Sequence, residues 1–143
     1  QWIGNRNGLH IDSYKRIQYV DGYKISLSNS TNNDLISSKI EDKSLWFINL
    51  GGYDPKKMYE EHQFTLVVAK KAIDAKKKAK RNWEANLESK HNDDYSGINY
   101  LEKVDDLHPI KIKNWEINLI PDPEKRSEKL IPDWYGYKRI DKF

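Results

Sequence analysis

The hydrophobic residues in the middle of the chain follow a strand-like pattern. The run Leu45–Leu50 (LWFINL) is apolar, with aromatic and β-branched side chains, and it predicts a largely buried strand. Gly51 and Gly52 follow directly and predict a tight turn, because paired glycines usually interrupt a strand. His62–Ala69 (HQFTLVVA) is rich in Phe, Thr and Val and predicts a second strand antiparallel to the first, so that the two form a hairpin with a long loop.

A helical pattern replaces the strand pattern from Lys70 to about Leu87. The segment consists mainly of strong helix formers, above all Ala and Lys. Its apolar residues recur at spacings of three and four and lie on one stripe, namely Ala72, Ala75, Ala79, Trp83 and Leu87. We therefore expect an amphipathic helix that packs this stripe against a sheet.

Three more segments predict strands, and the remaining polar segments predict connections. The strands are expected at Tyr23–Ser28, Ile110–Lys113 and Trp115–Ile120. Asn29–Ser44 is dense in Ser, Asn and Asp and predicts a connection. The tail after Pro121 is charged at first and then aromatic, so we expect it to dock on the rest of the molecule.

The chain also carries an internal repeat. Gln1–Tyr14 aligns without a gap with Asn82–Tyr95. The identical residues include rare types that chance seldom aligns together, and they are Trp2/Trp83, Asn5/Asn86, His10/His91, Asp12/Asp93 and Tyr14/Tyr95. After a short insertion, Val20-Asp21 aligns with Val104-Asp105. This self-similarity predicts a duplicated supersecondary unit whose two copies pack against each other.

The repeat predicts an α+β fold of two related strand-strand-helix-strand units, with a mainly antiparallel sheet and the helix packed on one face. The expected segments are a remnant of the first unit at 1–28, a polar connection at 29–44, a complete second unit at 45–120 and a tail at 121–143, all in one compact domain. The first copy has no counterpart of the elements that begin at Leu45, so we expect about 35–40 residues to be missing ahead of Gln1. A homodimer would cover the surface that they leave.

Composition narrows the classes of protein. The 143 residues carry a formal net charge of +3, which is too small to identify a polyanionic partner. The absence of Cys excludes disulfides, thiolate nucleophiles and cysteine-ligated zinc, and it is compatible with the cytoplasm. Since no apolar run approaches the roughly 20 residues that span a bilayer, we expect a cytoplasmic protein without membrane contact.

The segment Leu50–Lys80 (LGGYDPKKMYEEHQFTLVVAKKAIDAKKKAK) resembles the bacterial domain-of-unknown-function 1543 family (DUF1543). The shared pattern is Leu-Gly-Gly, a Glu-x-His formed by Glu60 and His62, an apolar strand and a helix of Ala and Lys. The segments His10–Tyr14 and Val20–Leu27 are also similar to this family, whose members look like single or paired copies of one unit. The resemblance implies a fold and no particular activity.

Three pairs of polar residues have a spacing that suits metal ligands. The members of each pair are two residues apart, so on an extended backbone both side chains point to one face and could hold a divalent cation. These pairs are His10/Asp12, Glu60/His62 and His91/Asp93. Because no HExxH motif is present and His–Asp pairs often form structural hydrogen bonds, we favour a structural polar network over a metal or catalytic site.

Two further features are candidate binding sites. Gly51 and Gly52, with Glu60 and His62 nearby, are candidate ligand-binding residues, because adjacent glycines can turn backbone amides toward an anion. A plain hairpin turn explains the glycines more simply, since no P-loop or dinucleotide motif surrounds them. The predicted helix is rich in basic residues that could contact a phosphate backbone, and the candidates are Lys76, Lys77, Lys80 and Arg81. The solvated face of an amphipathic helix accounts for them better.

Together these features favour a non-enzymatic interaction or ligand-binding module. The first alternative is a metal-dependent enzyme that uses Glu60, His62, His91 and Asp93. The second is a weak nucleic-acid binder that uses the Lys-rich helix. The serines lie in polar segments without a nucleophile elbow, so the sequence assigns no catalytic residue, and it assigns no cofactor.

Overall fold

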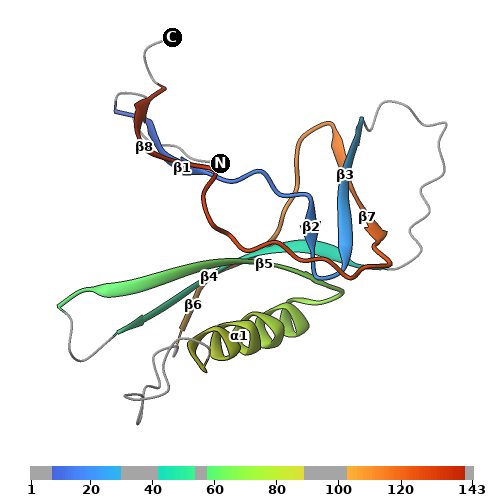
Figure 1. The fold of residues 1–143 in the computed structure, drawn as a ribbon, viewed down its shortest axis with the longest axis horizontal. Helices are drawn as coiled ribbons and strands as arrows, with labels where there is room; N and C mark the ends of the chain where they lie inside the picture. The colour runs from blue at the N-terminus through green and yellow to red at the C-terminus, as the bar shows by residue number, and fades with distance from the viewer. Residues whose placement is uncertain (1–7, 30–41, 54–57, 89–102, 141–143) are drawn as a thin grey trace.

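Three antiparallel sheets and one helix make up the part of the chain that this computed structural model describes, namely residues 8–29, 42–53, 58–88 and 103–140 (Figure 1). In chain order the elements are β1 (His10–Tyr14), β2 (Tyr19–Val20), β3 (Tyr23–Asn29), β4 (Ser44–Tyr53), β5 (Glu60–Ala69), α1 (Ala72–Glu88), β6 (Lys103–Pro109), β7 (Trp115–Pro121) and β8 (Trp134–Arg139). The sheets have the orders β5-β4-β6, β2-β3-β7 and β1-β8. The predicted α+β class and antiparallel pairing are therefore confirmed.

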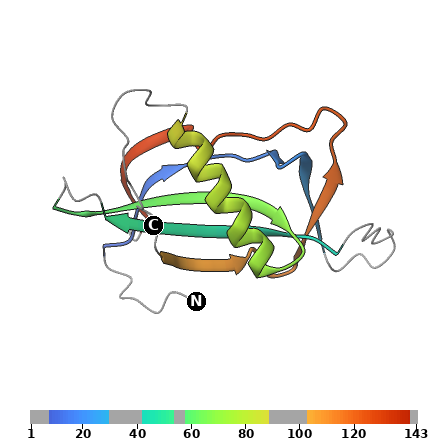
Figure 2. The same ribbon diagram turned by 90° about the horizontal axis from the view of Figure 1, so that it is seen from below.

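The central sheet, β5-β4-β6, packs one face against α1, which lies across its strands (Figure 2). Ile48 and Leu50 of β4 and Val67 of β5 are fully buried on this face. Ala75 and Ala79 of α1 lie over them, and their small side chains let the helix approach the sheet closely. Each large aliphatic side chain buried in this way contributes about 1.5–3 kcal/mol to stability. At Ala75 and Ala79 the predicted alanine stripe packs against the sheet, as expected.

The second sheet, β2-β3-β7, packs against the opposite face of the central sheet. Successive side chains of a strand point to opposite faces, so β4 contributes Leu45 to this second core while Ile48 faces the helix. Val68 of β5 and Val20 of β2 are also buried here. The central sheet is thus sandwiched between α1 and the second sheet over part of its length.

The tail docks along an early segment of the chain, as its aromatic composition predicted. β8 pairs with β1 in an antiparallel ribbon that stands away from the central sheet (Figure 1). Between β7 and β8 the tail follows the backbone of the segment from β1 to β3, and the ladder is formed by Asp122 N–H to Gly22 C=O, Glu128 N–H to Tyr19 C=O and Asp133 N–H to Tyr14 C=O. This pairing ties both ends of the described chain together.

The glycine turn predicted after Leu50 is wrong. β4 continues through Gly51 and Gly52 as extended strand to Tyr53, and it pairs with β5 over this whole length. The partner strand begins at Glu60, earlier than the sequence indicated, and its backbone groups extend the ladder past the glycines. The hairpin itself, with β5 antiparallel to β4, is confirmed.

The strand predicted at Ile110–Lys113 is also wrong. The strand lies earlier, as β6, and it ends at Pro109, which has no N–H to continue a ladder. Ile112 forms only an isolated bridge with Trp115, through a turn in which Asn114 adopts a φ of 64°. The neighbouring strand β7 agrees with its predicted position.

The predicted duplication stays a prediction. Each of the five identical pairs has one member in residues 1–7 or 89–102, outside the described residues, and most of the predicted connection at 29–44 also lies outside them. Val20-Asp21 ends β2 and enters a turn, whereas the aligned Val104-Asp105 lies inside β6. In addition, β3 of the first predicted unit pairs along its whole length with β7 of the second, so the two units share one sheet.

Candidate functional site

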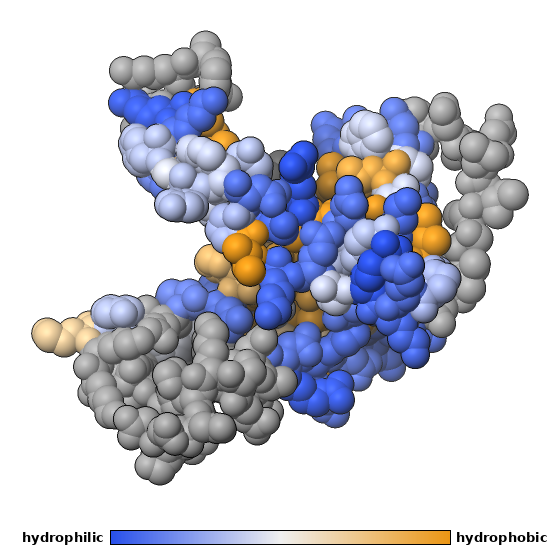
Figure 3. Space-filling model, in the orientation of Figure 1, coloured by the Kyte–Doolittle hydropathy of each residue, from blue (hydrophilic) through white to orange (hydrophobic). Residues whose placement is uncertain are grey.

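One half of the central sheet's second face is not covered by the second sheet. Beyond the buried Leu45, the strands present a mixed aromatic and polar surface, which we call the open-face patch: Phe47, Asn49, His62, Phe64, Asp106 and His108. Strand register places these residues in adjacent rows, because Phe64 and Asp106 flank Asn49 while His108 lies beside Phe47. Figure 3 shows the molecule hollowed between the β1–β8 ribbon and the central sheet.

Aromatic rings form the first part of the open-face patch. The rings of Phe47 and Phe64 have centroids 5.7 Å apart at 26°, and the rings of Phe47 and His108 have centroids 5.4 Å apart at 37°. These separations lie within the range of favourable ring contacts. Phe64 nevertheless keeps 54% of its surface exposed. The three strands therefore hold a partly water-exposed cluster of rings.

Polar groups lie beside the rings. The Nδ2 amide of Asn49 donates a hydrogen bond to Oδ2 of Asp106 at 3.3 Å, which orients the carboxylate. The Oδ1 atom of Asn49 is buried and has no hydrogen-bond partner among the described residues. A buried acceptor without a partner costs about 1–3 kcal/mol, so Asn49 holds this position at some cost in stability.

Only some of the predicted ligand-binding residues lie in or beside the open-face patch. His62 is exposed and pairs with Gly51, which is buried. Gly52 pairs with Glu61 and belongs to the helix-facing side by strand alternation, and Glu60 pairs with Tyr53 at the end of the ladder. The extended backbone of both glycines does not form the curved amide array of an anion nest.

The His10/Asp12 pair lies elsewhere, on the β1–β8 ribbon. His10 donates from Nδ1 to the carbonyl of Gly8 at 2.9 Å, and its Nε2 lies 3.2 Å from Oδ1 of Asp12. The His10 ring also lies 4.5 Å from the ring of Tyr137. Among the described residues no three His, Asp or Glu side chains gather as metal ligands. The predicted partners His91 and Asp93 lie outside the described residues.

The basic side chains of α1 divide into two groups. Of the candidates for nucleic-acid contact, Lys77 and Arg81 are exposed, whereas Lys76 and Lys80 are half-buried. Lys78 is another basic residue of this helix, and its Nζ lies 2.8 Å from Oδ2 of Asp21 in the β2–β3 turn. Lys78 and Asp21 therefore form an ion pair within the protein, and only folding brings these two residues together.

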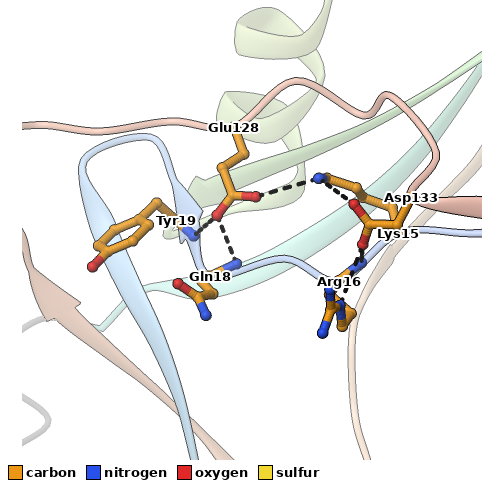
Figure 4. A network of polar contacts seen from close by, with 6 residues as sticks. All are labelled: Lys15, Arg16, Gln18, Tyr19, Glu128 and Asp133. Carbon is orange, nitrogen blue, oxygen red and sulfur yellow. Dashed lines mark hydrogen bonds and ion pairs between the residues drawn. The ribbon is translucent and has the colours of Figure 1, made fainter.

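Two carboxylates fasten the tail to the segment before β2 (Figure 4). Glu128 accepts hydrogen bonds from the backbone N–H groups of Gln18 and Tyr19 at 2.9 and 3.0 Å. Asp133 accepts from the backbone N–H of Arg16 at 2.8 Å and from Lys15 Nζ at 2.9 Å, and these bonds lower the pKa of Asp133 to about 2. The network positions the tail and contains no member of the open-face patch.

Asp122 forms a second fastening with Arg126. The guanidinium donates to both carboxylate oxygens, at 2.9 and 2.8 Å, and it also lies 4.0 Å from the centre of the Tyr19 ring. The side-chain hydrogen bonds from Arg126 lower the pKa of Asp122 to about 2, and the same contacts raise the pKa of Arg126. The sequence analysis missed both fastenings. Glu128 and Asp133 lie far from their partners in the chain, whereas Asp122 and Arg126 are four residues apart in a segment that the sequence indicated only as charged.

Comparisons with known proteins agree on the family. The family described as "Domain of Unknown Function (DUF1543)" matches residues 1–27 and 57–108, together more than half of the chain. The crystal structure of the protein Il1583 from Idiomarina loihiensis is similar, with a TM-score of 0.59 and 27% sequence identity, over 96% of this chain and 68% of that one. No curated protein matches the chain, and no described helix has the length and apolarity to cross a membrane. On this match over more than half of its residues, the chain belongs to the DUF1543 family.

Proposed function

We propose that this chain is a non-enzymatic binding module whose ligand lies on the open-face patch. The observation that carries the proposal is the exposed aromatic surface of Phe47, Phe64 and His108 on a three-stranded sheet. Exposure of apolar rings to water is unfavourable, so a ligand that covers them gains binding free energy. The same sheet is well packed on its other face, so these rings are not a sign of a loose core.

The patch has the composition of a recognition surface. Aromatic rings supply contact area at a low entropic cost, and neighbouring polar groups fix the orientation of what binds. Asn49 and Asp106 supply such groups within the patch, and His62 with Gly51 extends it toward the end of β4. Regular strands also hold these side chains more rigidly than loops would.

A fragment screen by NMR tests the proposal. The ¹⁵N-labelled chain is titrated with small fragments of varied charge that carry a flat ring or planar group, and backbone shifts are mapped. We expect the hits to cluster at the open-face patch and Phe64→Ser to weaken them about three- to tenfold, the effect of losing one ring contact.

The matched control for this experiment is Ile73→Ser on α1. Ile73 is 55% exposed, almost equal to the 54% of Phe64, but it lies on the helix. The control removes the same kind of exposed apolar surface, so it should leave fragment binding unchanged. Hits scattered over the molecule, or equal effects of the two substitutions, would contradict the proposal.

A further inference from the structure

We infer that the open-face patch takes the guanidinium group of an arginine side chain carried by a partner peptide segment. This inference rests on the function proposed above and specifies its ligand. It follows from the pairing of an exposed aromatic surface with the exposed Asp106 carboxylate.

The polar groups of the patch favour a ligand with positively charged hydrogen-bond donors. Asp106 is exposed and accepts only one contact within the described residues, the 3.3 Å hydrogen bond from Asn49. An ionised carboxylate has about four acceptor positions, so most of them face outward. A ligand that offers several N–H donors would match these oxygens.

The aromatic rings of the patch favour a planar ligand group that can stack on them. A guanidinium is planar, carries five N–H donors and no acceptor, and stacks on aromatic faces. Phe47 and Asp106 are diagonal neighbours on adjacent strands, since Asp106 pairs with Asn49 and His108 pairs with Phe47. Such neighbours are about 7–8 Å apart, so a guanidinium stacked over Phe47 comes within reach of the carboxylate. An ammonium group would gain the charge contact but not the stacking.

The open shape of the patch favours a peptide over a free small molecule. Small-molecule sites are usually concave and bury most of the ligand, whereas this patch is the surface of a sheet with Phe64 more than half exposed. An arginine on a peptide adds contacts from its neighbouring residues along the strands. Arginine and aromatic residues are also the typical centres of protein interfaces.

Peptide titrations followed by NMR test the inference. The probes are three seven-residue peptides that differ only at their central residue, which is arginine, citrulline or lysine, and the small guanidine agmatine. Citrulline keeps the shape of arginine and loses its charge. We expect the arginine peptide to shift the signals of Phe47, Asn49, Phe64 and Asp106, with at least about tenfold weaker binding of the citrulline peptide and at least threefold weaker binding of the lysine peptide and of agmatine.

Substitution of the carboxylate supplies the second arm. Asp106→Asn keeps an acceptor for Asn49 and should weaken the arginine peptide about tenfold. The matched control is Glu116→Gln on β7, which removes one exposed carboxylate from another sheet and should change nothing. Because the citrulline arm uses the unmodified chain, the inference stays testable if Asp106→Asn disturbs the fold.

The outcomes separate the ligand from the site. Equal binding of the arginine and citrulline peptides, or of the arginine peptide to the wild type and Asp106→Asn, overturns the guanidinium assignment. Agmatine that binds as tightly as the arginine peptide overturns the assignment to a peptide segment. If neutral or acidic fragments bind the patch while the arginine peptide does not, only this inference fails. If nothing binds there, the proposed function fails with it.

Discussion

Asp21 joins the second sheet to the central sheet and the helix, and its removal gives the sharpest test of this fold. The residue sits in the β2–β3 turn, and its side chain is only 10% exposed. Its Oδ2 accepts a hydrogen bond from the backbone N–H of Val68 at 2.7 Å and lies 2.8 Å from Nζ of Lys78. One carboxylate oxygen therefore satisfies the outer edge of β5 and a lysine of α1 at the same time.

Asp21→Ala should destabilise the protein by about 3–4 kcal/mol. Loss of a hydrogen bond to a charged group at a poorly exposed site accounts for about 1.5–3 kcal/mol. Asp21 also has a φ of 54°, and a residue with an ordinary side chain adds about 1–2 kcal/mol in this left-handed region. Asp21→Asn keeps an acceptor for Val68 and tolerates the backbone, so we expect a loss of only about 1–2 kcal/mol.

Urea unfolding followed by tryptophan fluorescence measures these changes, with the slope of the transition as the check that unfolding stays two-state. A double-mutant cycle with Lys78→Met isolates the ion pair, whose coupling energy should be about 1 kcal/mol. An Asp21→Ala variant within about 0.5 kcal/mol of the wild type, or a coupling energy of zero, would refute this account of how the layers are joined.

Two predictions concern the charged side chains. Asp122 and Asp133 have folded-state pKa values of about 2 against an ordinary 3.8. Their contribution to stability is therefore present above pH 3.8 and is lost as the pH falls toward 2. Thermal melts across this pH range should show this loss of stability, and the loss should be smaller in Asp122→Asn. An equal fall in melting temperature for the wild type and Asp122→Asn would contradict the stabilising role of the Asp122–Arg126 contact. Lys77→Glu combined with Arg81→Glu should leave retention of a single-stranded oligonucleotide in a gel unchanged, since both side chains lie on a solvated helix face. A salt-sensitive band shift that the double variant abolishes would restore the nucleic-acid hypothesis.

The elements of the central layer could be predicted because local patterns determine them. The apolar run of β4, the Phe, Thr and Val of β5 and the alanine spacing of α1 are properties of neighbouring residues. The boundaries were less accurate where a partner strand decides. Gly51 and Gly52 look like a turn in isolation, but the ladder with β5 keeps them extended.

The candidate site shows the same division. His62 and Gly51 attracted attention by residue type, and the structure places His62 in the patch and Gly51 beside it. The rest of the patch gave one faint signal, a polar Asn49 inside the apolar run of β4. That Asp106 of a later strand lies beside Asn49 follows only from the register of β6 on β4.

The sequence by itself determined the α+β class, the hairpin and the helix, because propensity, alternation and helical spacing act over a few residues. The family followed separately, from the resemblance of its motifs. Tertiary structure decided that β3 pairs with β7, that the tail runs along the segment before β2, and that, among the described residues, the second sheet covers only part of the central sheet. These outcomes depend on contacts between residues far apart in the chain. Many alternative pairings of strands bury similar apolar area, and only the complete set of contacts selects one of them.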